Sequence, residues 1–330
     1  MAPEEKPYPT NVRLDFEGGR INALVVGGLW LLVTGDLKDG AYELKIANQT
    51  GNDSNEATLT RYEPTFNGNT FLPRLFPLEP GENKFTLIAT KNGQKSETKD
   101  FTLLGDGFSY KSHGIEIQLV GSSDDPIYPQ KLLGELAALI ETTNLFLENP
   151  IKLVRGSEGI GAYANFVPGG KMLIDRKYFE FSKEKNDVIH VQIVFWHEAA
   201  HIFIRQIENE YSDMVQFGNM YRKLKKAGSE LFDLFDESSY LDIPKEWGHP
   251  YSTAGELFAS ASSVLHFVPE QFIAKVNELP GEHRVVVVEA AKLVLSYYLN
   301  NKNCPKNLFG HKLVEFLGLD KNQDKKAIVR

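Results

Sequence analysis

The feature that most constrains this fold is a ten-residue run, VFWHEAAHIF, which extends from Val194 to Phe203. Its apolar side chains occupy every turn, so the run predicts a buried helix, expected from about Asp187 to Glu210. An α-helix turns about 100° per residue, which brings positions four apart onto one side, stacked one turn along the axis. The chain is therefore expected to fold around a buried helix that directs the imidazoles of His197 and His201 to one point.

This HExxH spacing predicts a metal site. With 8 histidines and at most 44 glutamates in 330 residues, roughly 0.03 matches are expected by chance. Burying two unpaired imidazoles would also cost free energy. Zn²⁺ is the expected metal, because it accepts two histidines and a carboxylate and keeps a fourth position open for water. Glu198 lies about 100° around the axis from His197, which suits a general base acting on zinc-activated water.

A third ligand must come from elsewhere in the chain. The extended HExxHxxGxxH pattern would need glycine at 204 and histidine at 207, but these positions hold Ile204 and Ile207, which excludes that class. The favoured candidate is Glu256, which begins an apolar helix 55 residues after His201. Glu256 also has a structural alternative, because Thr253-Ala254-Gly255-Glu256 fits a helix capping box. Other candidate ligands are Asp242, Glu246 and His249.

The HExxH helix, followed by Tyr251 and then by the Glu256-Leu257-Phe258-Ala259 helix, resembles the gluzincin group of zincin-like metallopeptidases. Within that group it is most similar to the lethal-factor-type toxin peptidases, over about residues 190–267. The resemblance implies that His197, His201 and Glu256 are zinc ligands, that Glu198 is the general base and acid, and that Tyr251 donates to the oxyanion. His249 is an alternative donor. The chain departs from the family at Ser260, where such peptidases often place an acidic partner.

The first third of the chain shows short strand-like runs separated by turn signals, which predicts an all-β domain over residues 1–106. Seven strands are expected, at 12–16, 24–26, 29–34, 42–47, 57–62, 84–90 and 98–104. Asn92-Gly93 predicts a tight hairpin between the last two. The final 25 or so residues resemble the last hairpin of immunoglobulin-like or fibronectin-like β-sandwich modules. Such a sandwich is expected to dock a protein partner or the substrate, since it shows no cluster of catalytic residue types.

Residues 107–330 are expected to form a second, α+β domain. The order is a strand at 115–120, a helix at 130–149, a strand at 151–154 and a strand pair at 162–166 and 171–174, all before the HExxH helix. Later apolar runs predict helices at 284–299 and 308–319. By resemblance this is a zincin-like catalytic domain, in which a peptide would bind as an added strand along the edge of the short sheet, at 162–166 or 171–174.

Charge, apolar run length and cysteine content argue against several other classes of protein. The formal net charge of −8, from 36 basic and 44 acidic residues, disfavours a nucleic-acid partner. No run reaches the roughly 18 apolar residues that a membrane span needs. The lone Cys304 closes no disulfide within the chain. The start, Met1-Ala2-Pro3-Glu4, is not a signal peptide, although a sandwich joined to a peptidase of secreted type is often found outside the cell.

The sequence thus predicts a zinc-dependent peptidase, an endopeptidase acting on a protein or peptide substrate. The alternative is a catalytically inactive zincin-like module, in which the metal is structural or absent and the β-sandwich makes the contacts that matter.

Overall fold

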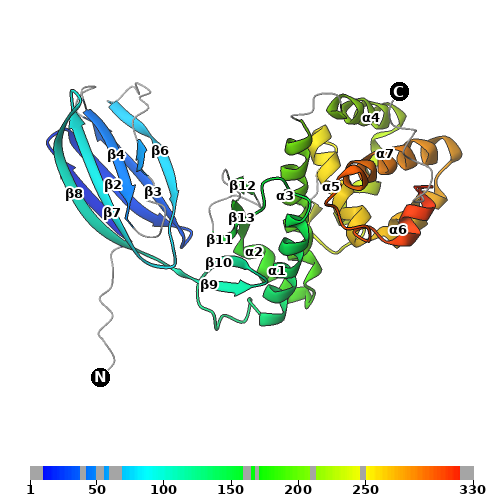
Figure 1. The fold of residues 1–330 in the computed structure, drawn as a ribbon, viewed down its shortest axis with the longest axis horizontal. Helices are drawn as coiled ribbons and strands as arrows, with labels where there is room; N and C mark the ends of the chain where they lie inside the picture. Colours follow the sequence, from blue (N-terminus) through cyan, green and yellow to red (C-terminus); the bar gives the residue numbers. More distant parts are fainter. Residues whose placement is uncertain are drawn as a thin grey trace.

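The computed structural model describes residues 10–37, 42–49, 56–58, 69–158, 165–167, 171–208, 213–245 and 250–319. An all-β region comes first and an α+β region follows it along the chain (Figure 1). None of the helices in these ranges combines the length and apolar character that crossing a membrane requires.

The all-β region consists of two four-stranded antiparallel sheets. The first has the order β1 (Asn11–Phe16), β2 (Gly19–Val26), β3 (Trp30–Leu37), β6 (Asn69–Pro77). The second has the order β5 (Glu56–Thr58), β4 (Tyr42–Asn48), β7 (Gly81–Lys91), β8 (Gln94–Gly105). Alternate side chains of both sheets meet in one buried core, including Ile21, Leu31, Leu44, Ile46 and Leu87. This alternation is what a strand with one buried face requires.

The predicted hairpin turn is confirmed. Asn92 and Gly93 join β7 to β8 with φ values of 52° and 78°, as a two-residue turn with both residues at positive φ requires. Gly27 and Gly28 separate β2 from β3, also at positive φ. The sequence prediction missed β6, whose prolines at 73 and 77 look like turn residues. Because β6 is an edge strand, it tolerates residues that cannot donate to a neighbouring strand. The predicted strand 57–62 is described only at 57–58, as part of β5.

The α+β region is built on a five-stranded sheet. Its order is β12 (Asn165–Val167), β13 (Lys171–Asp175), β11 (Leu153–Ser157), β10 (Ile115–Val120), β9 (Gly107–Ser112). The three central strands are parallel and the two edge strands are antiparallel to their neighbours. The predicted order of strand, helix, strand and strand pair is confirmed, whereas β9 and the helix directly after β13 were not predicted. Lys171–Asp175 lies between two strands, so the prediction that this strand could offer a free edge is wrong.

Eight α-helices and two 3₁₀ helices complete the described part of this region. They are α1 (Gln130–Asn144), α2 (Arg176–Lys185), α3 (Ile189–Glu208), α4 (Asp213–Ala227), η1 (Ser229–Phe235), η2 (Glu237–Ser239), α5 (Ala254–Phe267), α6 (Pro269–Glu278), α7 (Gly281–Asn300) and α8 (His311–Phe316). The long α3 lies between the sheet with α1 on one side and α5 and the later helices on the other (Figure 1). It is the predicted buried helix.

The predicted extension of α1 to Asn149 is wrong, because the helix ends at Asn144. The Asn144 side chain accepts from the Ile151 backbone N–H at 2.7 Å and donates to the Ile151 carbonyl at 2.9 Å. These two bonds turn the chain back, so Phe146 and Leu147 enter the core from a loop instead of from a helical stripe.

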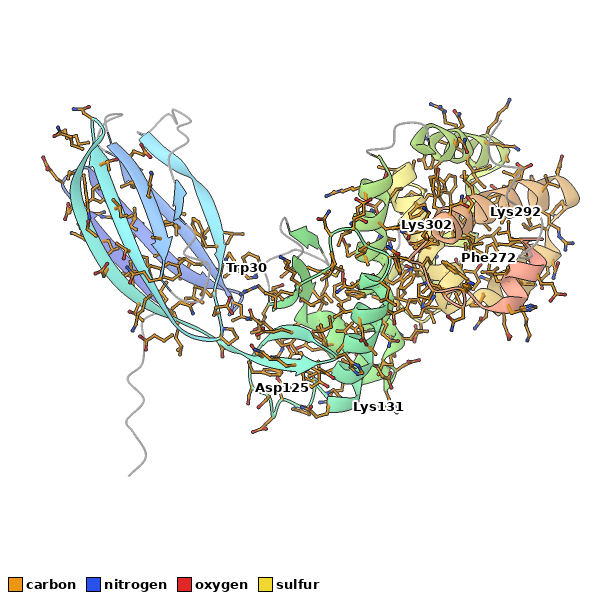
Figure 2. The ribbon with its side chains drawn as sticks, in the orientation of Figure 1. Trp30, Asp125, Lys131, Phe272, Lys292 and Lys302 are labelled. Atoms are coloured by element: carbon orange, nitrogen blue, oxygen red, sulfur yellow. The ribbon has the colours of Figure 1, made fainter. Side chains whose placement is uncertain are left out.

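The two regions meet at a tight, polar junction. Arg155 of β11 is only 2% exposed and donates to the Leu78 carbonyl and to Glu79, with 3.2 Å between Nη2 and Oε1. Gln118 of β10 donates to the other Glu79 oxygen. A Cβ on Gly28 would lie 2.6 Å from Val120 Cγ1 and 3.0 Å from the Asp106 carbonyl oxygen, so this position has no room for a side chain. Figure 2 shows Trp30 at this end of the β region.

Candidate metal centre

The candidate metal centre is built on α3, whose position is fixed by aromatic packing. Trp196, directly before the first histidine of the motif, is buried and donates through Nε1 to the Ser262 hydroxyl at 2.8 Å. Its ring stacks on His266 with 4.0 Å between centroids and an interplanar angle of 2°. Ser262 in turn bonds the Tyr298 hydroxyl at 2.7 Å. These contacts tie α3 to α5 and α7, so the side chains beside Trp196 are held in place.

The structure brings together the three residues predicted as ligands. His197 and His201 lie one turn apart on α3, with ring centroids separated by 5.0 Å. Glu256 projects from the first turn of α5, and its Oε2 lies 3.2 Å from His197 Nε2 and 3.3 Å from His201 Nε2. One potential ligand atom from each residue lies within 4.8 Å of the other two. Their role as ligands remains a prediction, which this clustering supports.

Thr253 caps α5 while the Glu256 carboxylate lies beside the two histidines of α3. The Thr253 hydroxyl accepts the Glu256 backbone N–H at 3.1 Å, so Thr253 caps α5 as predicted. The Glu256 carboxylate meanwhile reaches the two imidazoles on α3. Capping therefore fixes where α5 begins, and the beginning of α5 fixes where Glu256 points.

Glu198 is the next residue on α3 and is partly buried. Burial raises the pKa of its carboxyl to about 7, although the neighbouring His197 acts in the opposite direction. Arg205, two turns further along the helix, also favours the ionised form. A carboxyl with a pKa near neutrality can both accept and return a proton at physiological pH, which is what a general base and acid must do.

Glu237 is a functional candidate that sequence reasoning missed. It comes from η2, is 2% exposed, and places Oε1 3.0 Å from His197 Nδ1. The expected acidic partner was sought one turn after Glu256, where the chain has Ser260. Ser260 is fully buried, and its Oγ has no hydrogen-bond partner among the residues that the structure describes. The signal for Glu237 was weak but present, since Asp236-Glu237 directly follows the apolar run at 231–235.

The charges of the cluster fit a divalent cation. Burial opposes protonation of His197, but hydrogen bonds to Glu237 and Glu256 outweigh it and raise its pKa to about 10. The same imidazoles hold the pKa of Glu256 well below its usual range, against the opposing effect of burial. Burial lowers the pKa of His201. The carboxylates of Glu237 and Glu256 thus contact the two imidazoles, and this concentration of negative charge favours a cation among them. Two imidazole nitrogens and a carboxylate oxygen form a donor set typical of zinc.

The remaining candidate residues named from the sequence differ in their exposure and in their contacts. Tyr251 is 60% exposed, and its backbone carbonyl accepts from the Tyr221 hydroxyl at 2.6 Å. Its role as an oxyanion donor stays a prediction. Asp242 forms an ion pair with Lys185 at 2.5 Å. Glu246 and His249 lie outside the described residues. Cys304 is half-buried, and burial raises the pKa of its thiol to about 12, which disfavours the thiolate that a metal ligand needs.

Comparison with known proteins adds little. No family model matches the chain, and no curated protein sequence matches it. Among solved structures, the chain is similar to a point mutant of the M1 zinc metallopeptidase from Deinococcus radiodurans. That alignment has 10% sequence identity and a TM-score of 0.24, and it covers 92% of this chain and 90% of the other. The likeness is too weak to decide fold or function, so the case for the site stands on its geometry.

Proposed function

We propose that this chain is a zinc-dependent peptidase of the gluzincin type. One observation carries the proposal: the nitrogens of His197 and His201 and an oxygen of Glu256 converge within 4.8 Å, beside the carboxyl of Glu198. His197, His201 and Glu256 would hold the ion. A bound zinc ion supplies Lewis acidity that polarises a carbonyl and lowers the pKa of water.

The residues of the chain then perform the proton transfers. The Glu198 carboxylate accepts a proton from the attacking water, which forms the new bond to the scissile carbonyl carbon. Glu198 then donates that proton to the leaving amine as the peptide bond breaks. In the metal-free protein, burial raises the pKa of Glu198 to about 7, and this supports its role in proton transfer. Tyr251 is the proposed donor to the oxyanion.

The proposed substrate is a protein or peptide bound as an added strand. β12 is one of the two edge strands of the five-stranded sheet and contacts α3. A peptide that pairs with the side of β12 on which no described strand lies would therefore pass beside the helix that carries the motif. We propose that residues 107–330 form this zincin-like domain. We propose that residues 1–106 form an immunoglobulin-like β-sandwich that docks a protein partner or part of the substrate.

The test compares wild type with Glu198→Gln, which keeps the shape of the side chain and removes its basicity. Both proteins should bind one zinc ion, measured by elemental analysis. Only the wild type should cleave peptides when the two are compared on a proteome-derived peptide library. Full peptidase activity in Glu198→Gln would refute the mechanism. Absence of stoichiometric zinc from the wild type would refute the enzyme and favour the inactive binding module.

A further inference from the structure

We propose that Glu237 is a positioning residue of the metal centre, which fixes the imidazole of His197 so that Nε2 faces the ion. The inference rests on the proposed function, because it assumes that His197 is a ligand. It extends that function by assigning a role to a residue of a 3₁₀ helix that lies between α3 and α5 in the sequence.

The contacts of His197 lead to this role. Its Nδ1 lies 3.0 Å from Glu237 Oε1, and its Nε2 lies 3.2 Å from Glu256 Oε2. The ring is therefore held between carboxylates at its two nitrogens. Only Nε2 faces the point shared with His201 and Glu256. A neutral imidazole that donates Nδ1–H to Glu237 has its lone pair on Nε2, which is the tautomer that a metal needs there.

The carboxylate of Glu237 is buried, so it needs a partner that compensates its charge. Taking a carboxylate out of water costs several kcal/mol unless it is paired and hydrogen-bonded. Yet Glu237 Oε2 is buried and has no hydrogen-bond partner within the described ranges of the chain. The contact that accounts for the buried charge is therefore the one to His197. Among the residues that the structure describes, no other side-chain partner of the Glu237 carboxylate provides a structural alternative.

The segment that carries Glu237 is fixed by contacts of its own. The Asp236 carboxylate accepts the Ser238 backbone N–H at 2.8 Å and caps η2. The Glu237 carbonyl accepts the backbone N–H groups of Tyr240 and Leu241, at 3.1 and 3.0 Å. Lys275 of α6 donates to the Ser239 carbonyl at 2.7 Å. The backbone of η2 therefore does not depend on the metal centre for its position, so Glu237 can orient His197.

Glu237 also accounts for the departure at Ser260. Ser260 lies one turn after Glu256 on α5 and offers no carboxylate, and its buried Oγ is unpaired. An acidic partner for a ligand histidine is provided here from η2 instead. The metal centre then draws on three separate segments: α3, α5 and η2.

The test is zinc affinity, measured by competition with a chromogenic chelator for wild type, Glu237→Gln and Asp233→Asn. Losing such a partner typically weakens metal binding by about 10- to 100-fold, which is the loss expected for Glu237→Gln. Asp233 is an exposed carboxylate in the preceding 3₁₀ helix, η1. Its variant removes the same charge nearby and should bind zinc like the wild type. Equal affinity in all three proteins would overturn the inference and leave the peptidase proposal intact.

A second measurement needs no variant at position 237. In the zinc-loaded wild type with ¹⁵N-labelled histidine, NMR should show a protonated Nδ1 for His197, assigned by its loss in His197→Asn. An unprotonated, zinc-bound Nδ1 would overturn the inference even if Glu237→Gln failed to fold. A wild type that binds no zinc would instead overturn the proposed function, and this inference with it.

Discussion

The buried carboxyl of Glu198 should make the metal-free protein less stable than its glutamine variant, by an amount that grows with pH. Burial raises its folded-state pKa from 4.5 to about 7. The protonated form is therefore favoured in the folded state, and this advantage is complete below pH 4.5 and lost as the pH rises through 7. At about 1.4 kcal/mol per pKa unit, ionised Glu198 costs the folded state about 1 kcal/mol at pH 5 and at most about 3 kcal/mol at pH 8.

Glu198→Gln removes this cost, so it should stabilise the metal-free protein by those amounts while abolishing peptidase activity. The measurement is urea unfolding of chelator-treated protein at pH 5 and pH 8, followed by circular dichroism. Glu184→Gln, on an exposed position of α2, controls for loss of the same charge and should show no comparable growth between the two pH values. If Glu198→Gln gains no stability from pH 5 to pH 8 relative to the wild type, the reasoning about its burial is wrong.

Two further predictions each compare a pair of substitutions by their effect on the free energy of unfolding, measured by chemical denaturation. Ser262→Ala should cost about 2 to 3 kcal/mol, because it leaves buried groups of Trp196 and Tyr298 unpaired. Ser260→Ala, two residues earlier, should be neutral or stabilise by up to about 1 kcal/mol, because it removes an unpaired hydroxyl. Equal losses of stability in Ser262→Ala and Ser260→Ala would contradict both expectations. At the junction between the two regions, Glu79→Ala should cost about 2 kcal/mol, because it leaves the buried Arg155 guanidinium without its carboxylate partner. Glu79 itself is 42% exposed, so the cost comes from the unpaired Arg155 and not from lost burial of Glu79. Arg155→Met should cost less, because it removes the buried charge altogether, and the opposite order would refute this account.

Several elements of the fold were predictable because their signals are local. The Asn92-Gly93 hairpin follows from two residues that accept positive φ. The alternating strands of the first region and the parallel strands of the second carry their own patterns of apolar residues. The missed elements are those in which the long-range environment decides. The edge strand β6 accepts prolines that would disrupt a central strand, and α1 ends early because Asn144 bonds to a residue seven positions later.

The candidate site likewise contains residues that a local pattern predicts and residues that only long-range packing brings together. The sequence alone determined that His197 and His201 share one side of a helix with Glu198 beside them, because the geometry of a helical turn is the same in every protein. It could not decide whether the Glu256 carboxylate bonds back to the cap residue or faces the histidines. In the structure the Thr253 hydroxyl caps α5, and the Glu256 carboxylate faces the histidines. Only the tertiary structure placed Glu237 against His197 and put β12, not β13, at the sheet edge. Such contacts join residues 40 or more positions apart, and they depend on how complete helices and strands pack, which no local pattern encodes.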